Sequence, residues 1–207
     1  MEHQHLGGKS CEELVREVTE GYEKTLSFPK EKPVPAVVVA LVGLIGTGKT
    51  IVSKALEKNL PLLRIEGDEL RRILRMRNEG YAHIDGLRKT ISLKYFNQGY
   101  SIIFDSDGAS GGLVEDYQKY IDRGLKIIWL RIIAPQSVIL ERLEKRPPDP
   151  IFANSPRAIH DYFRRKHLHE HLAMPLTFTL DTSLPLEPQI GEALPLVRHA
   201  AGWNAVP

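Results

Sequence analysis

One stretch of the chain carries a residue pattern that could bind phosphate. Residues 43–50 read GLIGTGKT and match G-x-x-x-x-G-K-[ST] at every fixed position. Glycines let consecutive backbone N–H groups turn toward a phosphate, the lysine reaches the β- and γ-phosphates, and the final hydroxyl can bind Mg²⁺. The pattern therefore predicts a nucleotide and Mg²⁺ at this loop. The expected binding residues are Gly43, Ile45, Gly46, Thr47, Gly48, Lys49 and Thr50.

The residues around this loop provide the context that the pattern requires. A β-branched run over 36–42 precedes it, and an amphipathic segment with Val52 and Leu56 on its apolar side follows. A helix that starts at the loop presents the positive end of its dipole to the phosphates. A glycine-rich turn without a ligand is the alternative, and the strand-loop-helix context argues against it.

A carboxylate and two cations follow the second predicted strand. Asp68 lies at the junction of this strand with a helix, and Arg71 and Arg72 lie one turn into that helix. The carboxylate could take the proton of an attacking hydroxyl, while an arginine holds an anionic acceptor or stabilises the transferred charge. Asp also caps helices, and capping is compatible with catalysis. We therefore expect Asp68 to be catalytic or substrate-positioning, with Arg71 and Arg72 contacting the acceptor.

An acid also ends the third apolar stretch, over residues 100–105. A carboxylate at the end of a buried strand can orient Mg²⁺ or its water shell. Asp105 is the first candidate for this role, and Asp107 is the second candidate. Asp105 is also expected to border the acceptor. The alternative is a loop Asp that satisfies the N–H groups of a turn.

Arginines gather around a proline-rich interruption at 146–157, which we expect to be a lid. Arg142 and Arg146 are four residues apart on a helix predicted over 135–146, and hence on one face. A closing segment excludes water and places positive charge on the transferred phosphate, which predicts a catalytic role for Arg146. Arg157, Arg164 and Arg165 lie beyond this segment. For Arg164 and Arg165, the alternative is a solvated, charged helix face.

The elements that must position these residues alternate from residue 36 onward. Strands are predicted over 36–42, 62–66, 100–105, 125–133 and 175–181. Helices are predicted over 49–59, 68–78, 84–98, 135–146, 156–171 and 187–197. Alternation of this kind is typical of an α/β fold with three layers, a parallel sheet of about five strands between helices. In such sheets the ligand site lies beyond the carboxyl ends of the strands.

Residues 1–35 differ from the rest of the chain. An amphipathic helix is predicted over 11–26, and the proline-containing link SFPKEKPVP follows it. A chain of 207 residues suits one substantial domain. We therefore expect an N-terminal helical arm over 1–35 and one domain over 36–207.

Composition limits the protein's partners and its location. Lys and Arg number 28 against 26 Asp and Glu, so the charge gives no argument for general attachment to nucleic acid or membranes. The single cysteine, Cys11, excludes an internal disulfide framework and fits a reducing compartment. No run reaches the roughly 18 apolar residues of a membrane span. These features predict a soluble, cytoplasmic protein; they say nothing of its oligomeric state.

Five segments together resemble the P-loop kinase group of small phosphotransferases, which includes nucleoside monophosphate kinases, adenylylsulfate kinase, gluconate kinase and zeta-toxin type enzymes. In the family's order they are GLIGTGKT, IEGDELRRIL, GYSIIFDSD, VILERLEKR and LTFTLDTSLPLEPQ. The resemblance covers residues 36–198 and implies a P-loop NTPase fold. It also implies the ATP-dependent transfer of a phosphate to a hydroxyl of a small-molecule acceptor.

The resemblance also implies roles for individual residues. Asp68 would be the general base and would contact the acceptor with Arg71, while Arg142 and Arg146 would contact ATP. Thr182 and Ser183 would border the adenine. The sequence departs from the family's pattern on the acceptor side, because no Arg follows Asp105-Ser106 and the lid is rich in proline instead of glycine. The identity of the acceptor therefore does not transfer.

Three other functions compete with this interpretation. Residues 105–108 satisfy D-x-x-G, but the chain lacks the N-K-x-D motif of regulatory GTPases. A polynucleotide 5′-hydroxyl kinase would use the positive charge near the acceptor cleft, although no aromatic residues alternate with it for base stacking. These cations are Arg64, Arg71, Arg72, Arg75 and Arg77. A non-catalytic nucleotide-binding module would bind ATP without transferring phosphate.

Three histidines cluster in HLHEH, residues 167–171. His167 and His171 are four residues apart on a predicted helix, but two imidazoles lack the further ligands of a usual zinc site. A solvated helix end is therefore the preferred interpretation of the cluster.

Overall fold

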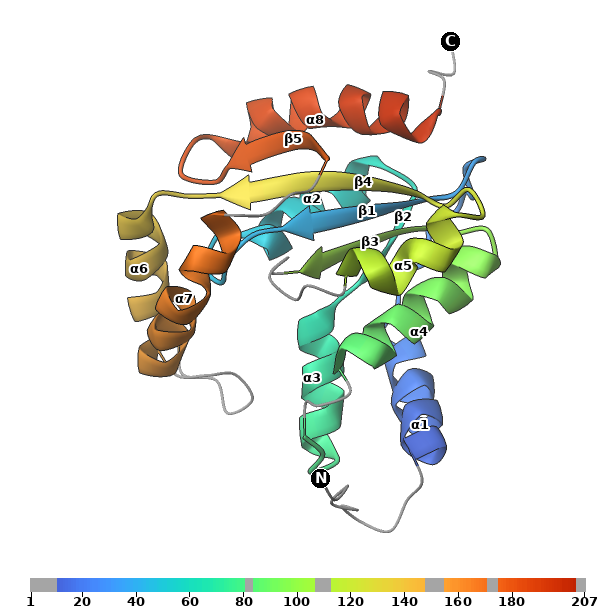
Figure 1. Ribbon diagram of the computed structural model, residues 1–207, viewed down its shortest axis with the longest axis horizontal. Helices are drawn as coiled ribbons and strands as arrows, with labels where there is room; N and C mark the ends of the chain where they lie inside the picture. Colours follow the sequence, from blue (N-terminus) through green and yellow to red (C-terminus); the bar gives the residue numbers. More distant parts are fainter. Residues whose placement is uncertain (1–10, 81–83, 107–112, 148–154, 171–174, 204–207) are drawn as a thin grey trace.

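The computed structural model describes residues 11–80, 84–106, 113–147, 155–170 and 175–203. A five-stranded parallel sheet with the strand order β2-β3-β1-β4-β5 forms its centre (Figure 1). The strands are β1 (Val37–Val42), β2 (Leu62–Ile65), β3 (Ser101–Ser106), β4 (Lys126–Ile133) and β5 (Leu176–Asp181). The predicted α/β fold with a parallel sheet of about five strands is confirmed.

The central strand β1 leads directly into the glycine-rich loop. It reads VVVALV, and all six residues are buried. Its neighbours pair in register, with Val38 opposite Ile102 of β3 and Ile127 of β4. A strand covered on both faces is apolar at every position instead of alternate positions, which explains the uninterrupted run.

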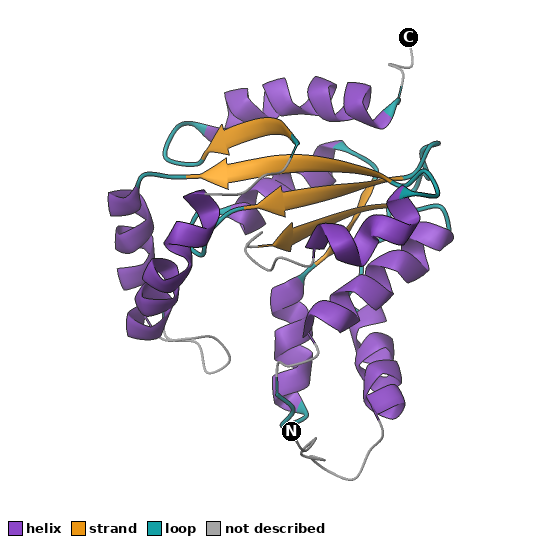
Figure 2. Ribbon diagram, in the orientation of Figure 1, coloured by secondary structure: helices purple, strands orange, loops and turns teal. Residues whose placement is uncertain are grey.

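Helices cover both faces of the sheet (Figure 2). On one face, α2 and α8 bury Leu56 and Val197 against Leu41 of β1. The other face packs around Phe104 with side chains from α1, α3, α4 and α5. α6 and α7 pack against each other beyond the carboxyl ends of the strands (Figure 1). The helices are α1 (Cys11–Glu23), α2 (Lys49–Asn59), α3 (Gly67–Met76), α4 (Ile84–Asn97), α5 (Leu113–Ile121), α6 (Gln136–Glu144), α7 (Ser155–Glu170) and α8 (Leu186–Ala201).

The N-terminal helix α1 contributes to the core. Val18 and Tyr22 are buried in the same cluster as side chains of α3 and α4. The Tyr22 hydroxyl accepts a hydrogen bond from the backbone N–H of Glu66 at 2.6 Å, and Arg77 donates to the Glu17 carbonyl at 3.1 Å. The arm thus packs on the elements that follow it, while the domain boundary at residue 35 stays a prediction.

Several local predictions differ from the structure, which ends α1 at Glu23 and extends α8 to Ala201. Helix α5 was not predicted, and the expected helix over 135–146 ends at Glu144 as α6. Arg146 precedes Pro147, and the ring of a proline disfavours helical geometry at the residue before it. Arg142 and Arg146 therefore do not share one helical face, which corrects that expectation. Within the described ranges, no helix is long and apolar enough to cross a bilayer.

Candidate active site

The loop between β1 and α2 has a shape that only glycine permits at two positions. Gly48 precedes α2 with φ 89°, in the left-handed region that favours glycine. A Cβ on Gly43 would lie 2.4 Å from the carbonyl oxygen of Ile132 on β4. The first N–H groups of a helix have no acceptor within it, so those of α2 remain available to an anion at the loop.

Lys49 is half-buried at the first position of α2. Its Nζ donates to the carbonyl oxygens of Gly43 at 2.7 Å and Leu44 at 3.0 Å. Burial lowers the pKa of Lys49, and the negative charges of Asp105 and Asp68 act in the opposite direction. The ammonium group thus lies near the loop and near the carboxylates at the ends of β2 and β3.

One cleft brings together three of the predicted site residues. Thr50, Asp68 and Asp105 line it, at the carboxyl ends of β2 and β3. Hydroxyl and carboxylate oxygens are ligands that Mg²⁺ accepts, so Thr50 and Asp105 fit a magnesium site there. The cleft is completed by Ser53, Arg64, Ile65 and Glu66. The second metal candidate, Asp107, lies outside the described residues.

The start of α3 exposes a carboxylate and a cation to this cleft. Asp68 Oδ1 lies 2.7 Å from Arg71 Nη1, and their side chains are 47% and 38% exposed. At this exposure the ion pair contributes little stability, and both groups are accessible to a ligand. α3 begins at Gly67, so Asp68 lies inside its first turn and the capping position belongs to Glu66.

Other arginines near the cleft are paired with carboxylates. Arg72 Nε lies 3.3 Å from Glu69, and Arg72 does not line the cleft. Arg64 pairs with Glu57 at 2.6 Å and with Glu66 at 2.7 Å. The predicted contact of Arg72 with the acceptor therefore stays a prediction, without support from its position.

A buried arginine holds the backbone at the end of β3. Arg88 of α4 is 8% exposed and donates to the Asp105 carbonyl oxygen at 2.9 Å and to Asp85 at 3.0 Å. The sequence prediction missed this residue. Its spacing from Ile84 and Ile91, at i+4 and i−3 on one helix, places it on the apolar face and could have indicated burial.

Arg142 and Thr182 join three distant segments around the loop. Arg142 of α6 donates to the Thr182 hydroxyl and to the Thr182 carbonyl, both at 2.7 Å, and to the Gly46 carbonyl at 3.3 Å. The Thr182 hydroxyl donates to the Thr47 carbonyl at 2.6 Å. We call these contacts the Arg142–Thr182 clasp. The structure brings both predicted nucleotide contacts to the loop, whereas Ser183 is exposed and bonds to Asp181 in its own turn.

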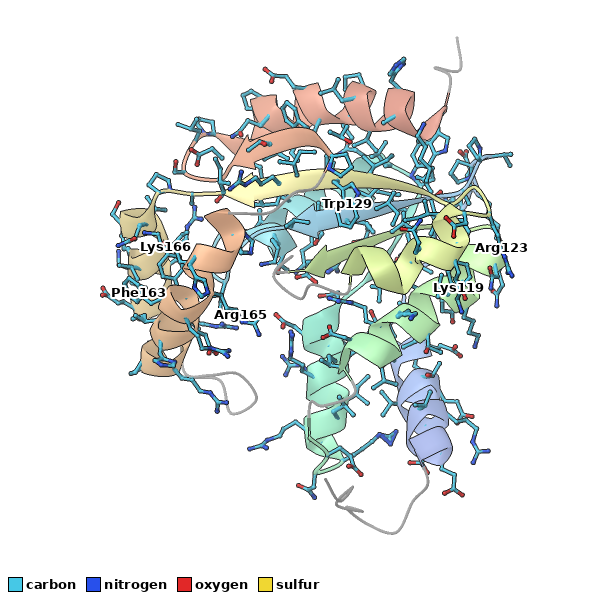
Figure 3. The ribbon with its side chains drawn as sticks, in the orientation of Figure 1. Lys119, Arg123, Trp129, Phe163, Arg165 and Lys166 are labelled. Atoms are coloured by element: carbon cyan, nitrogen blue, oxygen red, sulfur yellow. The ribbon has the colours of Figure 1, made fainter. Side chains whose placement is uncertain are left out.

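The arginines beyond the lid take different positions on α7. Arg164 pairs with Asp161 at 3.1 Å on an exposed face. Figure 3 shows Arg165 on the side of α7 that faces α3, while Lys166 lies on the opposite side and donates to Gln136 of α6 at 2.8 Å. Arg146 is half-buried just past α6, and most of the predicted lid lies outside the described residues.

His169 contradicts the expectation of a solvated helix end. It is 6% exposed, and its pKa is lowered to about 4 by burial and then by the positive charges of Lys49, Arg131 and Arg165. His167 is exposed on the same helix, and His171 lies outside the described residues. In the part of the chain that the structure describes, no three potential metal ligands cluster.

Comparison with solved structures shows the fold that this site belongs to. A protein from Chloroflexus aurantiacus has a TM-score of 0.61 at 19% identity, covering 80% of this chain and 98% of its own. A gluconokinase from Sinorhizobium meliloti has a TM-score of 0.55 at 20% identity, covering 81% and 95%. The APS kinase of Mycobacterium tuberculosis, in complex with AMPPNP and APS, has a TM-score of 0.52 at 17% identity, covering 80% and 99%.

These likenesses show the fold of P-loop small-molecule kinases and confirm the resemblance on which the sequence prediction drew. No curated protein matched the sequence. The AAA domain family matches residues 38–167, which is more than half of the chain and includes the loop, Asp68, Asp105 and Arg142. The chain therefore belongs to the AAA domain family.

Proposed function

We propose that the protein is an ATP-dependent kinase that moves the γ-phosphate of Mg·ATP to a hydroxyl of a small, anionic acceptor. The observation that carries this proposal is the shared cleft of Thr50, Asp68 and Asp105 beside Lys49. A nucleotide-binding loop alone would not need a carboxylate positioned for a second substrate. The fold of the P-loop small-molecule kinases supports the same function.

On the nucleotide side, the N–H groups of the loop and Lys49 hold the phosphates of ATP. Lys49 exchanges its present bonds to the loop carbonyls for phosphate oxygens. Thr50 and Asp105 hold Mg²⁺, which neutralises phosphate charge when it is bound. Arg142 and Thr182 place the loop against the turn after β5, where the base of the nucleotide lies, and Arg146 from the lid stabilises the transferred charge.

On the acceptor side, Arg71 binds the acceptor and Asp68 removes its hydroxyl proton. The acceptor oxygen then forms a bond to the γ-phosphorus, and the bond from that phosphorus to the bridging oxygen of ADP breaks in line. The proton stays on the Asp68 carboxyl group and leaves to solvent after product release. In this proposal residues 36–207 form the kinase domain, and residues 146–157 form its lid. The protein acts in the cytoplasm.

The structure gives less support to a polynucleotide 5′-hydroxyl kinase. That function needs cations free to bind a phosphate backbone. Arg64 and Arg72 instead pair with nearby carboxylates, and Arg77 pairs with Glu17 at 3.5 Å. A small acceptor is therefore the better match for the cleft.

The test measures ADP release from Mg·ATP with a panel of acceptors: sugar acids, nucleosides, nucleotide sulfates, aminoglycosides and 5′-hydroxyl oligonucleotides. Acceptor-dependent release should fall by at least about 100-fold in Lys49→Ala and in Asp68→Asn, because each removes a group that acts in the transition state. Lys54→Ala, an exposed lysine of α2, is the matched control. Nucleotide binding without acceptor-dependent release by the wild type would contradict the kinase and favour a binding module.

A further inference from the structure

Two buried nitrogen atoms beside the active site lack hydrogen-bond partners among the described residues. They are Nε2 of His169, near the end of α7, and Nε of Arg131, in β4. His169 is 6% exposed, so solvent does not replace the missing partner. A buried polar group left unsatisfied costs about 1–3 kcal/mol, which makes two such groups in one region a feature that requires an explanation.

Among the described residues, the charges that act on His169 are positive. Those acting on the imidazole belong to Lys49 of α2, Arg131 of β4 and Arg165 of α7. Cations that converge from three elements repel one another unless an anion lies among them. His169 and Arg131 therefore provide unsatisfied polar groups at a place where negative charge is favourable.

The strand register places this region beside the loop. Arg131 pairs with Val42, the last residue of β1, and Asp105 on β3 pairs with Leu41. β1 separates β3 from β4, so strand spacing puts the two backbones about 10 Å apart. Figure 3 shows Arg165 on the side of α7 that faces α3, the helix that carries Asp68. Arg131 therefore lies at the same edge of the sheet as Asp105, and Arg165 lies on the side of α7 toward the helix that carries Asp68.

We propose that His169, Arg131 and Arg165 form a subsite for an anionic group of the phosphate acceptor, either a carboxylate or a sulfate or phosphate ester. The acceptor would lie with its reacting hydroxyl at Asp68 and this anionic group between β4 and α7. Its identification as an acceptor subsite rests on the proposed kinase function. The nucleotide's phosphates are served by the loop and Lys49, which leaves Arg131 and His169 for a second anion.

Binding of the anion changes the protonation of His169. The imidazole of the free protein is neutral near pH 7, since its pKa is about 4. An anion beside it offsets the three neighbouring cations and raises that pKa, so proton uptake should accompany binding at mildly acidic pH. The imidazole signals of His169 therefore report directly on occupancy.

The experiment follows the imidazole ¹H–¹⁵N signals of the full chain, saturated with Mg·AMPPNP to fill the loop. Sodium sulfate and sodium malonate are titrated separately. Sulfate represents a sulfate or phosphate ester and malonate represents a carboxylate, so the probe that binds identifies the preferred group. At least one should shift the His169 signals saturably. Arg131→Gln should weaken this binding about tenfold or more through loss of a charge-assisted hydrogen bond, while the exposed His167→Gln should leave it unchanged.

The subsite is refuted if neither probe shifts His169, or if folded Arg131→Gln binds as tightly as the wild type. If Arg131→Gln does not fold, the titration of the wild type alone decides whether the subsite exists. Turnover of acceptors is measured in parallel on the same protein. Turnover without a response of His169 would overturn the subsite and leave the kinase standing, whereas a response without turnover would support the anion site and contradict the kinase.

Discussion

At the scale of single residues, His169 links stability to pH. Its pKa of about 4 lies below the value near 6.5 of an unfolded histidine, so the unfolded state binds more protons between these values. The positive charges of Lys49, Arg131 and Arg165 beside it disfavour the protonated imidazole. The free energy of unfolding should therefore fall as the pH drops from 6.5 toward 4.

This prediction is checked by urea unfolding at a series of pH values. In His169→Gln the decrease between pH 6.5 and 4 should be smaller by on the order of 2–3 kcal/mol, whatever the substitution does at neutral pH. His167→Gln, on the exposed face of the same helix, should keep the wild-type slope. An unchanged slope in His169→Gln would show that the imidazole does not stay neutral on folding.

The positions of site residues could be predicted from the sequence where the order of strands and helices along the chain determines them. Asp68 follows β2 and Asp105 lies at the carboxyl end of β3, and parallel strands end at one edge, so their common cleft is a consequence of topology. The burial of His169 and Arg88 depends on packing between elements distant in sequence. HLHEH in isolation is a polar segment, and only the folding of the chain around α7 removes His169 from water.

At the scale of elements, the Arg142–Thr182 clasp holds the loop, α6 and the turn after β5 together. Thr182→Val keeps the shape of the side chain but removes the hydroxyl that bonds to Arg142 and to the Thr47 carbonyl. We expect a loss of about 1–3 kcal/mol in the free energy of unfolding, because a half-buried guanidinium and a carbonyl lose their partner.

Urea unfolding measures this change, and binding of a fluorescent ATP analogue should weaken in parallel because the loop loses its support. Ser183→Ala is the control for the unfolding measurement, since this neighbouring hydroxyl is exposed and bonds only within its own turn in the described structure. Equal effects of the two substitutions would contradict the clasp.

The sequence predicted most elements, but it missed one short helix and misplaced several helix ends. α5 was missed after a glycine-rich stretch, although Tyr117, Tyr120 and Ile121 recur at helical spacing. α6 stops at Glu144, earlier than its apolar periodicity indicates, because Pro147 restricts the residue before it. Periodicity identifies the presence of an element more reliably than its ends.

At the scale of the whole molecule, α1 is expected to support the acceptor side. Tyr22 is 1% exposed, and its hydroxyl accepts the Glu66 N–H just before α3. Tyr22→Ala should lower the free energy of unfolding by about 3–5 kcal/mol, as other large-to-small changes of buried aromatic residues do. Thermal and urea unfolding check this against Glu20→Ala, an exposed residue of the same helix. Similar stabilities of the two variants would show that the arm is dispensable to the core.

The Arg142–Thr182 clasp also orders events during synthesis. Gly46 lies 96 residues before Arg142, and Thr47 lies 135 residues before Thr182. A growing chain that ends before β5 has no partner for the Thr47 carbonyl and none for Arg142 in the turn after β5, because Thr182 has not yet been synthesised. The loop therefore acquires its final support only after β5 has been made, and ribosome-bound chains stalled before residue 182 should bind nucleotide only weakly.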